Sequence, residues 1–364
     1  MQENNIFEKE ELLSENENFS DRDIPHITPV LEESGVKYVQ YVPYGFTPKT
    51  FKEKREIRKT TNAMSGGMMC IIAVSLLYGI LFPFLMMSLG YSMENAYSIL
   101  REPAFSQVSQ IFFSIFTFTV PFIVIYKALK FRISDLISFK LPNKNNLLPI
   151  LIIGISFCSF ANIAITYASQ IFEGFGINYK VDYGDNPKGF FGFMLSLIST
   201  VIVPALVEEF AFRGIILGSL KKFGEGFAII VSSVMFSLMH GNFEQIPFAF
   251  LVGLILGFVA VKTDSIWSAV IIHGFNNFIS VFFNYFLNDY SIEIQNIIYT
   301  VFLSVTLLFG IIAVWKLKNS LEFLSLNKSE SESTETKKYK WVFTTPLAIV
   351  FIVISLILSM THFV

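Results

Sequence analysis

Long runs of apolar residues follow one another along this chain from about residue 63 onward. A helix that crosses a bilayer needs about 20 such residues, and nine segments approach or exceed that length. They cover residues 66–91, 104–126, 147–171, 189–220, 226–241, 246–261, 265–287, 295–315 and 342–362. The sequence therefore predicts an all-α, polytopic membrane helix bundle of about 8–9 transmembrane helices. The two short segments, 226–241 and 246–261, are open to a second interpretation as one re-entrant pair.

Composition supports a membrane protein and excludes some partners. Hydrophobic residues make up 53% of the 364 residues and charged residues only 15%, whereas soluble domains carry roughly 25% charged residues. The net charge of -2 offers no basic patch for nucleic acid,. We therefore expect membrane lipid around the chain and no nucleic-acid partner.

Charge divides the chain into four regions. Residues 1–62 form a cytoplasmic arm, acidic up to residue 36 and predicted to be disordered there, then basic beside the first membrane helix. Residues 63–316 form the helix bundle, 317–341 a solvated cytoplasmic linker of low complexity, and 342–364 a C-terminal transmembrane helix. Basic residues follow the positive-inside rule in one orientation only, with Lys221 and Lys222 inside. This indicates an integral protein of a bacterial-type plasma membrane with its N-terminus in the cytoplasm.

Charged and imidazole side chains within the predicted spans are few. Each costs roughly 2.5 kcal/mol or more to insert, so each is a functional candidate. They and the amides beside them are Glu208, Glu209, Arg213, His240, His273, Asn276 and Asn277. At about 1.5 Å per residue, Glu208, His240 and Asn277 each lie about 20 Å from the nearest cytoplasmic marker. Three different helices therefore bring polar side chains to one layer near mid-membrane.

Spacing within the helices refines this site. Glu209 and Arg213 stand at i and i+4 in the favourable orientation for an ion pair, which leaves Glu208, about 100° away around the helix, to point elsewhere. His273 and Asn277 share one helix face, and Asn276 is close enough in angle to share the role of Asn277. A water-filled chamber open to the cytoplasm would hydrate such a site. Phe236 is interpreted as a wall of the site.

Three short motifs occur in order along the predicted spans and together resemble those of a known protein family. Glu208-Glu209-Phe-Ala-Phe-Arg213 matches EExxxR, Phe236-Ser-Leu-Met-His240 matches FxxxH, and His273-Gly-Phe-Asn-Asn277 matches HxxxN. Together they resemble the CAAX protease and bacteriocin-processing (CPBP, or Abi) family of intramembrane endopeptidases, over roughly residues 188–285. The flanking spans are similar to that family only in being membrane helices.

The resemblance implies hydrolysis of a peptide bond in or beside the membrane. It implies that Glu208 activates a water, that His240 helps to position this water, and that His273 and Asn277 hold the oxyanion. Glu209 and Arg213 would form the supporting ion pair. The implied substrate is a peptide or protein, including lipidated or membrane-anchored ones, and no cofactor is expected.

Alternatives stay open at this point. Glu208, His240 and His273 could form a His₂Glu zinc site with a water in the fourth position, which would make the enzyme a zinc-dependent version of the same protease. A membrane immunity or scaffold protein could retain the motif without catalysis. Intramembrane acids and histidines also line ion pathways in transporters, but no inverted repeat accompanies them here. The substrate and the oligomeric state cannot be read from the sequence.

Overall fold

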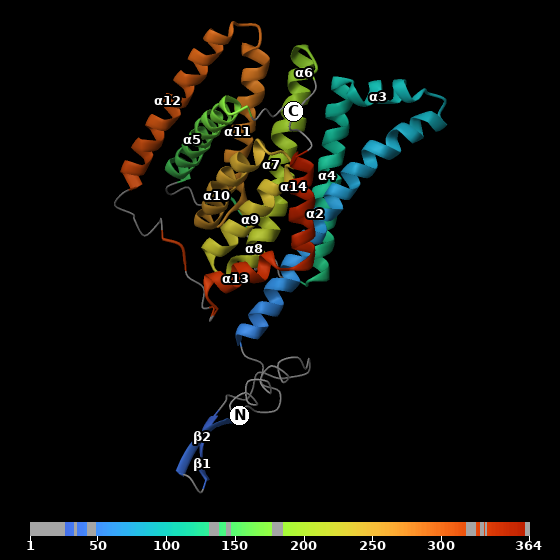
Figure 1. The fold of residues 1–364 in the computed structure, drawn as a ribbon. Coiled ribbons are helices and arrows are strands. Elements are labelled where there is room, and N and C mark those ends of the chain that lie inside the picture. Colours follow the sequence, from blue (N-terminus) through green and yellow to red (C-terminus); the bar gives the residue numbers. More distant parts are fainter. Residues whose placement is uncertain are drawn as a thin grey trace.

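A computed structural model of the chain describes residues 26–32, 35–41, 49–130, 138–142, 147–176, 185–317, 325–327, 331 and 333–360. Within these residues the protein is a bundle of helices preceded by one β-hairpin (Figure 1). The longer helices are α2 (Lys49–Ser88), α4 (Pro103–Ala128), α5 (Leu147–Gly174), α10 (Gln245–Thr263), α11 (Ile266–Leu287) and α12 (Ile292–Leu317). The polytopic helical bundle predicted from the sequence is confirmed.

Seven helices or joined helices are long and apolar enough to cross a membrane within the described ranges. They are α2, α4, α5, the joined segment Gly189–Phe223, α10, α11 and α12. A bent pair, α13 (Glu335–Phe343) and α14 (Pro346–Met360), raises the number to eight. The predicted fifth span corresponds to α9 (Glu225–Met239), an apolar helix of 15 residues. That helix is too short to count as a span by itself, which accounts for the difference from nine segments.

The hairpin lies partly where the sequence predicts disorder. Strand β1 (His26–Glu32) pairs antiparallel with β2 (Gly35–Tyr41), so that His26 faces Tyr41 and Glu32 faces Gly35 in the register. The structure thus differs from our expectation for residues 26–32, 35 and 36, while residues 1–25, 33 and 34 lie outside the described ranges. Apolar, β-branched and aromatic residues recur in both strands and favour this conformation, although the acidic composition of the arm hides that signal.

Polar residues at helix ends set several boundaries. The side chain of Ser92 caps α3 (Met93–Arg101) by accepting from the Asn95 amide, and Glu102 caps α4 by accepting from the Phe105 amide at 2.6 Å. Pro103 follows Glu102 at the first helical position, where its missing N–H costs nothing. These caps satisfy amides that the first turn of a helix leaves unpaired.

The segment 189–223 occupies the centre of the bundle. Half of the residues in its most apolar 18-residue stretch are buried inside the bundle, against 22% of those in the corresponding stretches of α2 and α4. It begins as α6 (Gly189–Ser196), continues through π-helical residues Leu197–Ile202 into α7 (Val203–Glu209), and becomes π-helical again over Phe210–Leu217. Such π-helical turns are rare and often mark functional sites. Here they lie on both sides of the short helix that carries Glu208 and Glu209.

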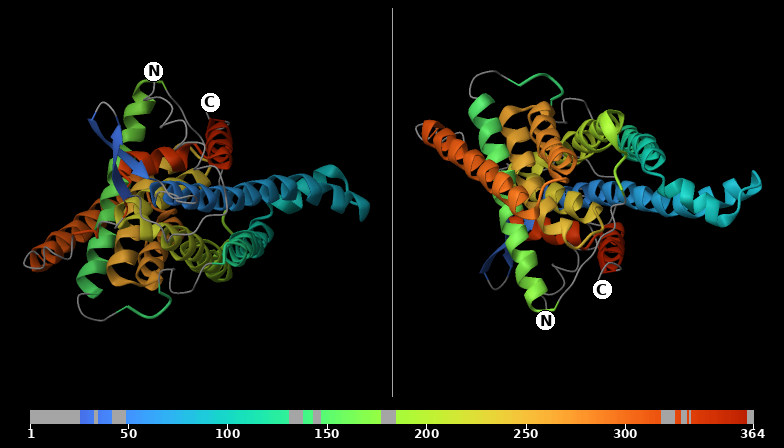
Figure 2. Two further views of the ribbon diagram at one scale, coloured as in Figure 1. Left: turned by 90° about the horizontal axis from the view of Figure 1, so that it is seen from below. Right: turned by 90° about the horizontal axis from the view of Figure 1, so that it is seen from above.

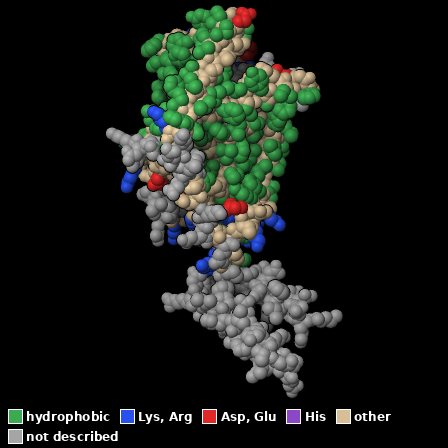
Figure 3. Space-filling view, turned by 90° about the vertical axis from the view of Figure 1, so that its left-hand side faces the viewer, with side chains coloured by type: hydrophobic (Ala, Val, Ile, Leu, Met, Phe, Trp, Pro, Cys, Tyr) green, Lys and Arg blue, Asp and Glu red, His purple; other side chains and the backbone are tan. Residues whose placement is uncertain are grey.

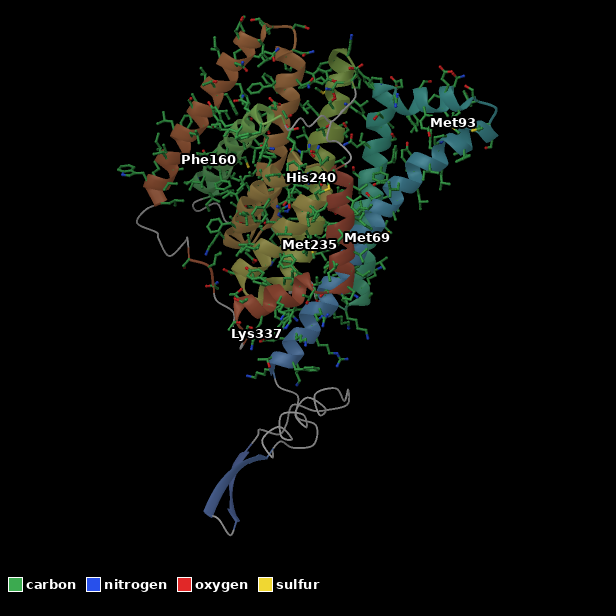
Figure 4. The ribbon with its side chains drawn as sticks, in the orientation of Figure 1. Met69, Met93, Phe160, Met235, His240 and Lys337 are labelled. Carbon is green, nitrogen blue, oxygen red and sulfur yellow. The ribbon has the colours of Figure 1, made fainter. Side chains whose placement is uncertain are left out.

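Helices α9 and α10 form a tight hairpin packed on this centre. A Cβ at Gly253 would come within 3.0 Å of the Ser233 side chain, and one at Gly257 within 3.2 Å of Ile229. Small residues four apart let two helix backbones approach closely, as in many membrane helix pairs. The turn of this hairpin follows His240, which Figure 4 places about midway along the bundle. The hairpin therefore places His240 near the middle of the bundle.

The C-terminal part differs from the predicted linker and span. Helix α13 begins inside the predicted linker, and a 70° bend separates it from α14. Glu225 accepts from the amide and the side chain of Asn327, so described parts of the linker are tied to the bundle. Figure 1 shows α13 crossing the lower end of the bundle while α14 rises beside α2.

The types of side chain on the surface change along the long axis of the bundle. Figure 3 shows a continuous belt of hydrophobic side chains around the visible face, with Lys and Arg gathered toward the lower end. Exposed apolar residues on α2 and α12, such as Leu81 and Ile311, supply part of the belt. Figure 2 shows α2 and α12 reaching out on opposite sides of the bundle. Apolar surface of this extent marks an interaction site such as a membrane. Together with the seven described helices that are long and apolar enough to cross a bilayer, it identifies an integral membrane protein.

Candidate active site

One cavity of about 680 Å³ collects the polar residues predicted from the sequence. Glu208, His240, His273 and Asn277 all line it, and Asn276 lines it beside them. They come from α7, from the end of α9 and from α11, so three separate helices contribute. The predicted common layer therefore corresponds to a common cavity.

Glu209 and Arg213 lie behind the cavity wall. Nη1 of Arg213 donates to Oε1 of Glu209 at 2.9 Å, and both side chains are fully buried. Nη2 of Arg213 also donates to the carbonyl oxygen of Gly253 at 3.2 Å. The ion pair expected from the i, i+4 spacing is present, and it ties the central helix to the α9–α10 hairpin.

His273 links the buried pair to the cavity. Its Nδ1 lies 2.8 Å from Oε1 of Glu209, and its Nε2 lies 4.0 Å from Oε2 of Glu208. The carboxylate of Glu209 can only accept, so Nδ1 of His273 carries the proton and donates. Nε2 is thereby directed at Glu208, whose side chain is 17% exposed to the cavity.

The Phe236 ring is the packing centre of the site. The guanidinium carbon of Arg213 lies 4.5 Å from the ring centroid, a cation–π geometry,. On other sides, the rings of His240 and His273 approach with centroids at 5.0 and 6.0 Å. A single aromatic side chain therefore packs against the Arg213 guanidinium and against both imidazoles, and it lines the cavity as the interpretation of Phe236 as a wall requires.

His240 is held at the end of α9. Its Nδ1 lies 2.9 Å from the carbonyl oxygen of Phe236, one turn earlier. Gly241 follows with φ +55°, a left-handed conformation that ends a helix at little cost for glycine,. Asn242 then accepts from the amides of Glu244 and Gln245 and starts the next helix. This turn leaves the imidazole exposed to the cavity.

The amides on α11 are anchored to two other helices. Nδ2 of Asn277 donates to the carbonyl oxygen of Thr200 at 3.0 Å, in the π-helical segment before α7. Asn162 on α5 lies within 3.4 Å of Asn276, and Asn276 is itself 3.4 Å from Asn277. Asn276 therefore shares the polar wall with Asn277, as their angular proximity on the helix suggests.

Glu208, His240 and His273 are the residues that a zinc site would use. In the described part of the chain, no three His, Cys, Asp or Glu side chains lie close enough together to hold a metal ion. Glu208, His240 and His273 line one cavity but do not form such a group in this conformation. The arrangement thus offers a carboxylate beside two imidazoles and an amide, without a ready-made three-ligand site.

Two features of the site escaped sequence reasoning. The bond between Glu209 and His273 joins residues 64 positions apart, and no spacing within one helix predicts it. The carbonyl groups of Thr200 and Gly253, which bind Asn277 and Arg213, carry no side-chain signal at all. A small residue at position 253 was the one available hint, because close helix approach exposes a backbone carbonyl to a neighbour.

Known proteins resemble the central part of the chain. Residues 190–279 match the family model described as Type II CAAX prenyl endopeptidase Rce1-like. A segment of 113 residues is 34% identical to the membrane-embedded CAAX protease MroQ of Staphylococcus aureus, covering 28% of this chain and 45% of that protein. A segment of 80 residues is 32% identical to the putative membrane peptidase YdiL of Bacillus subtilis, covering 22% of this chain and 33% of that protein.

These matches cover less than half of either relative's length. No solved structure matches the chain. The matched family segment nevertheless contains all six predicted site residues together with Asn276.

Proposed function

We propose that this membrane protein, whose residues 190–279 carry an Rce1-like CAAX endopeptidase domain, hydrolyses a peptide bond within the membrane by using a water activated by Glu208. The convergence of Glu208, His240, His273 and Asn277 on one cavity supports the proposal. Each is costly inside a bilayer, and three helices place them together. Scattered structural hydrogen bonds would not require a shared cavity.

In the proposed mechanism Glu208 acts as the general base. Its carboxylate takes a proton from a water as the water oxygen attacks the scissile carbonyl carbon. The same carboxylic acid then returns the proton to the amide nitrogen as the C–N bond breaks. General acid–base catalysis of this kind contributes about 10²- to 10⁴-fold to rate. His240, exposed to the same cavity, holds the water in place.

The oxyanion that forms on the carbonyl oxygen needs donors. Asn277 donates through its amide, and His273 donates through Nε2 when the imidazole is protonated. Glu209 accepts from the other ring nitrogen and balances that charge. Oxyanion donors in a water-excluded site are worth about 3 to 4 kcal/mol each. The buried Glu209–Arg213 pair thus supports the site by fixing the His273 ring.

The proposal includes an orientation in the membrane. Phe223 accepts from Lys338 of α13 and Lys221 pairs with Asp264, so Lys221, Lys222 and Lys262 lie at the end of the bundle that carries α13. The positive-inside rule assigns this end to the cytoplasm. Helix α2 begins at the same end (Figure 1). We assign the protein to a bacterial-type plasma membrane, with a peptide or protein in that membrane as its substrate.

A zinc-dependent version is the second candidate, and one observation favours it. Histidines that bind zinc usually donate their other ring nitrogen to a carboxylate, and His273 donates to Glu209 in this way. Glu208, His240 and His273 would be the ligands, and zinc would supply a more acidic water. The present geometry does not bring these three together as a metal site, so no step of the proposed mechanism passes through a metal.

Comparison of wild type with Glu208→Gln tests hydrolysis directly. Peptide ends in membranes of cells expressing each protein are identified by N-terminal labelling and mass spectrometry. We expect ends that depend on Glu208 and remain with the control Glu293→Gln, which changes an exposed glutamate at the end of α12. If Glu208→Gln retains both the peptide ends and the biological effect, the protein acts as a non-catalytic immunity or scaffold protein.

A further inference from the structure

The cavity extends from the middle of the bundle into one half of it. On the central segment 189–223 its lining residues are Thr200, Pro204 and Glu208. On α11 they run from Ile272 to Asn288, and on α12 from Gln295 to Leu303. Thr200, Pro204, the lining residues from Asn277 onward and those of α12 lie in the halves of their segments nearer the α11–α12 connection. Glu208 and residues 272–276 lie close to the middle of theirs. The cavity therefore extends from Glu208 toward that connection, whereas the sequence suggested a chamber open to the cytoplasm.

The two ends of the bundle differ in charge. Asp289 lies in the connection between α11 and α12 and Glu293 in the first turn of α12, while Asp264 precedes α11 and Lys316 lies in the last turn of α12. Lys221 pairs with Asp264 at 3.5 Å, and the nearby Phe223 carbonyl accepts from Lys338 of α13, so Lys221 and Lys262 lie at the end of the bundle that α13 crosses. The cavity thus reaches away from the end that the positive-inside rule assigns to the cytoplasm.

We propose that the substrate segment reaches Glu208 from the non-cytoplasmic side, through the part of the cavity between α11 and α12. The inference rests on the proposed function, because it assigns an entry route to the same site. Asn288 and Asn296 line the cavity and are exposed at its outer end. Entry there would bring a peptide to Glu208 without crossing the basic end of the bundle.

The lining of this route fits the main chain of a peptide. Between the outer end and the site it presents the carboxamides of Asn284, Asn288, Gln295 and Asn296, and deeper those of Asn276 and Asn277. A carboxamide both donates and accepts, as a peptide group does. An extended segment entering the cavity would exchange its hydrogen bonds with water for bonds with these side chains. The ring of Phe283, which contacts Tyr299 and Phe302, adds an apolar wall for its side chains.

Cysteine labelling in intact cells tests the route. Asn296→Cys and Ser280→Cys place thiols at the outer end and deeper in the cavity. Ile297→Cys is the matched control, because this neighbour of Asn296 is 62% exposed on the apolar surface. Lys337→Cys marks the basic end, where Figure 4 shows Lys337. A membrane-impermeant maleimide is applied before and after permeabilisation, and each cysteine is quantified by peptide mass spectrometry.

We expect Asn296→Cys and Ser280→Cys to react in intact cells as fully as in permeabilised cells. Ile297→Cys should stay unmodified in lipid, and Lys337→Cys should react only after permeabilisation. Reaction of Ser280→Cys only after permeabilisation, or in neither state, would overturn the proposed route. Reaction of Lys337→Cys in intact cells would overturn it as well, because the orientation would be reversed. Asn284→Cys replaces Ser280→Cys if that variant does not reach the membrane.

The route and the proposed function can fail separately. Labelling needs no catalysis, so the same pattern is expected in a Glu208→Gln background. The predicted labelling without any cleavage dependent on Glu208 would leave the route intact and refute hydrolysis. Cleavage that depends on Glu208, combined with labelling of the cavity cysteines from the basic side alone, would support hydrolysis and refute the route. As an activity test, Asn296→Trp should narrow the route and lower kcat/KM, whereas Ile297→Trp should not.

Discussion

His273 and Glu209, 64 residues apart in the chain, are joined by a 2.8 Å hydrogen bond between Nδ1 and Oε1. The same oxygen of Glu209 accepts from Arg213. One buried carboxylate therefore fixes both a structural cation and a ring that faces the cavity. Stability and activity should respond differently to changes around it, and the following experiments separate the two.

Replacing Glu209 should destabilise the fold much more than replacing Glu208. Glu209→Gln leaves the guanidinium of Arg213 fully buried without its counter-charge. Removing one partner of a buried ion pair costs roughly 3–5 kcal/mol. Thermal unfolding of the purified protein in detergent measures the loss, with Glu208→Gln as the control because its side chain faces the cavity. Equal unfolding temperatures for the two variants would contradict the structural role of the pair.

The effects of Glu209 and His273 on activity should be coupled. If Glu209 acts by orienting the His273 ring, replacing Glu209 should cause no further loss of activity in a protein that already lacks this ring. The double variant Glu209→Gln/His273→Gln should then have the same kcat as His273→Gln alone, measured per folded molecule. The effects of Glu209→Gln and His240→Gln should instead add, because the His240 ring is bonded to Phe236. Residues without shared partners usually behave additively, so full additivity of Glu209 and His273 would refute the positioning role.

Chelators should leave activity intact if Glu208 alone activates the water. Purified protein is treated with 1,10-phenanthroline or EDTA, and cleavage of a substrate identified by the peptide-end comparison is measured. Unchanged turnover agrees with glutamate catalysis. Loss of turnover that zinc restores, together with zinc found in the untreated protein, would favour the zinc-dependent version instead.

Lys338 should anchor α13 to the bundle. Its buried ammonium donates to the Phe223 carbonyl oxygen at 2.6 Å and pairs with Glu335 at 2.5 Å, above the ring of Phe227. Lys338→Ala leaves that carbonyl without the ammonium donor, at a cost of about 1–3 kcal/mol. We expect faster limited proteolysis near α13.

The neighbouring Lys337→Ala supplies the control for this experiment. Lys337 is exposed, so its loss should leave the digestion rate unchanged. Similar digestion of the two variants would show that α13 is held by other contacts.

The sequence predicted those parts of the structure that depend on one helix at a time. The apolar runs gave the bundle, and the spacing of Glu209 and Arg213 gave their ion pair. Counting residues from the basic ends placed Glu208, His240 and Asn277 at one depth, and all three line the cavity. Helix geometry alone is enough for each of these steps.

Relationships between distant segments could not be read in this way. The residues around Lys338 are rich in charge, which is typical of a solvated segment. The Lys338 side chain is nevertheless buried, and it donates to a carbonyl oxygen 115 residues away in the chain. The π-helical turns around α7 shift the angular positions of residues beyond them, which a count at 100° per residue does not include. The extent of the cavity toward α12 likewise depends on how α11 and α12 diverge.

The contact between α14 and α2 has a consequence for biogenesis. The Leu347 amide donates to the side chain of Asn62, 285 residues earlier in the chain. This contact cannot form until the ribosome has made the intervening residues, so α2 must wait in the bilayer with one face unpaired throughout that time. Helix α2 therefore enters the membrane early but reaches its final packing only after α14 is made. In a chain stalled before α14, the uncovered face of α2 could bind another membrane helix.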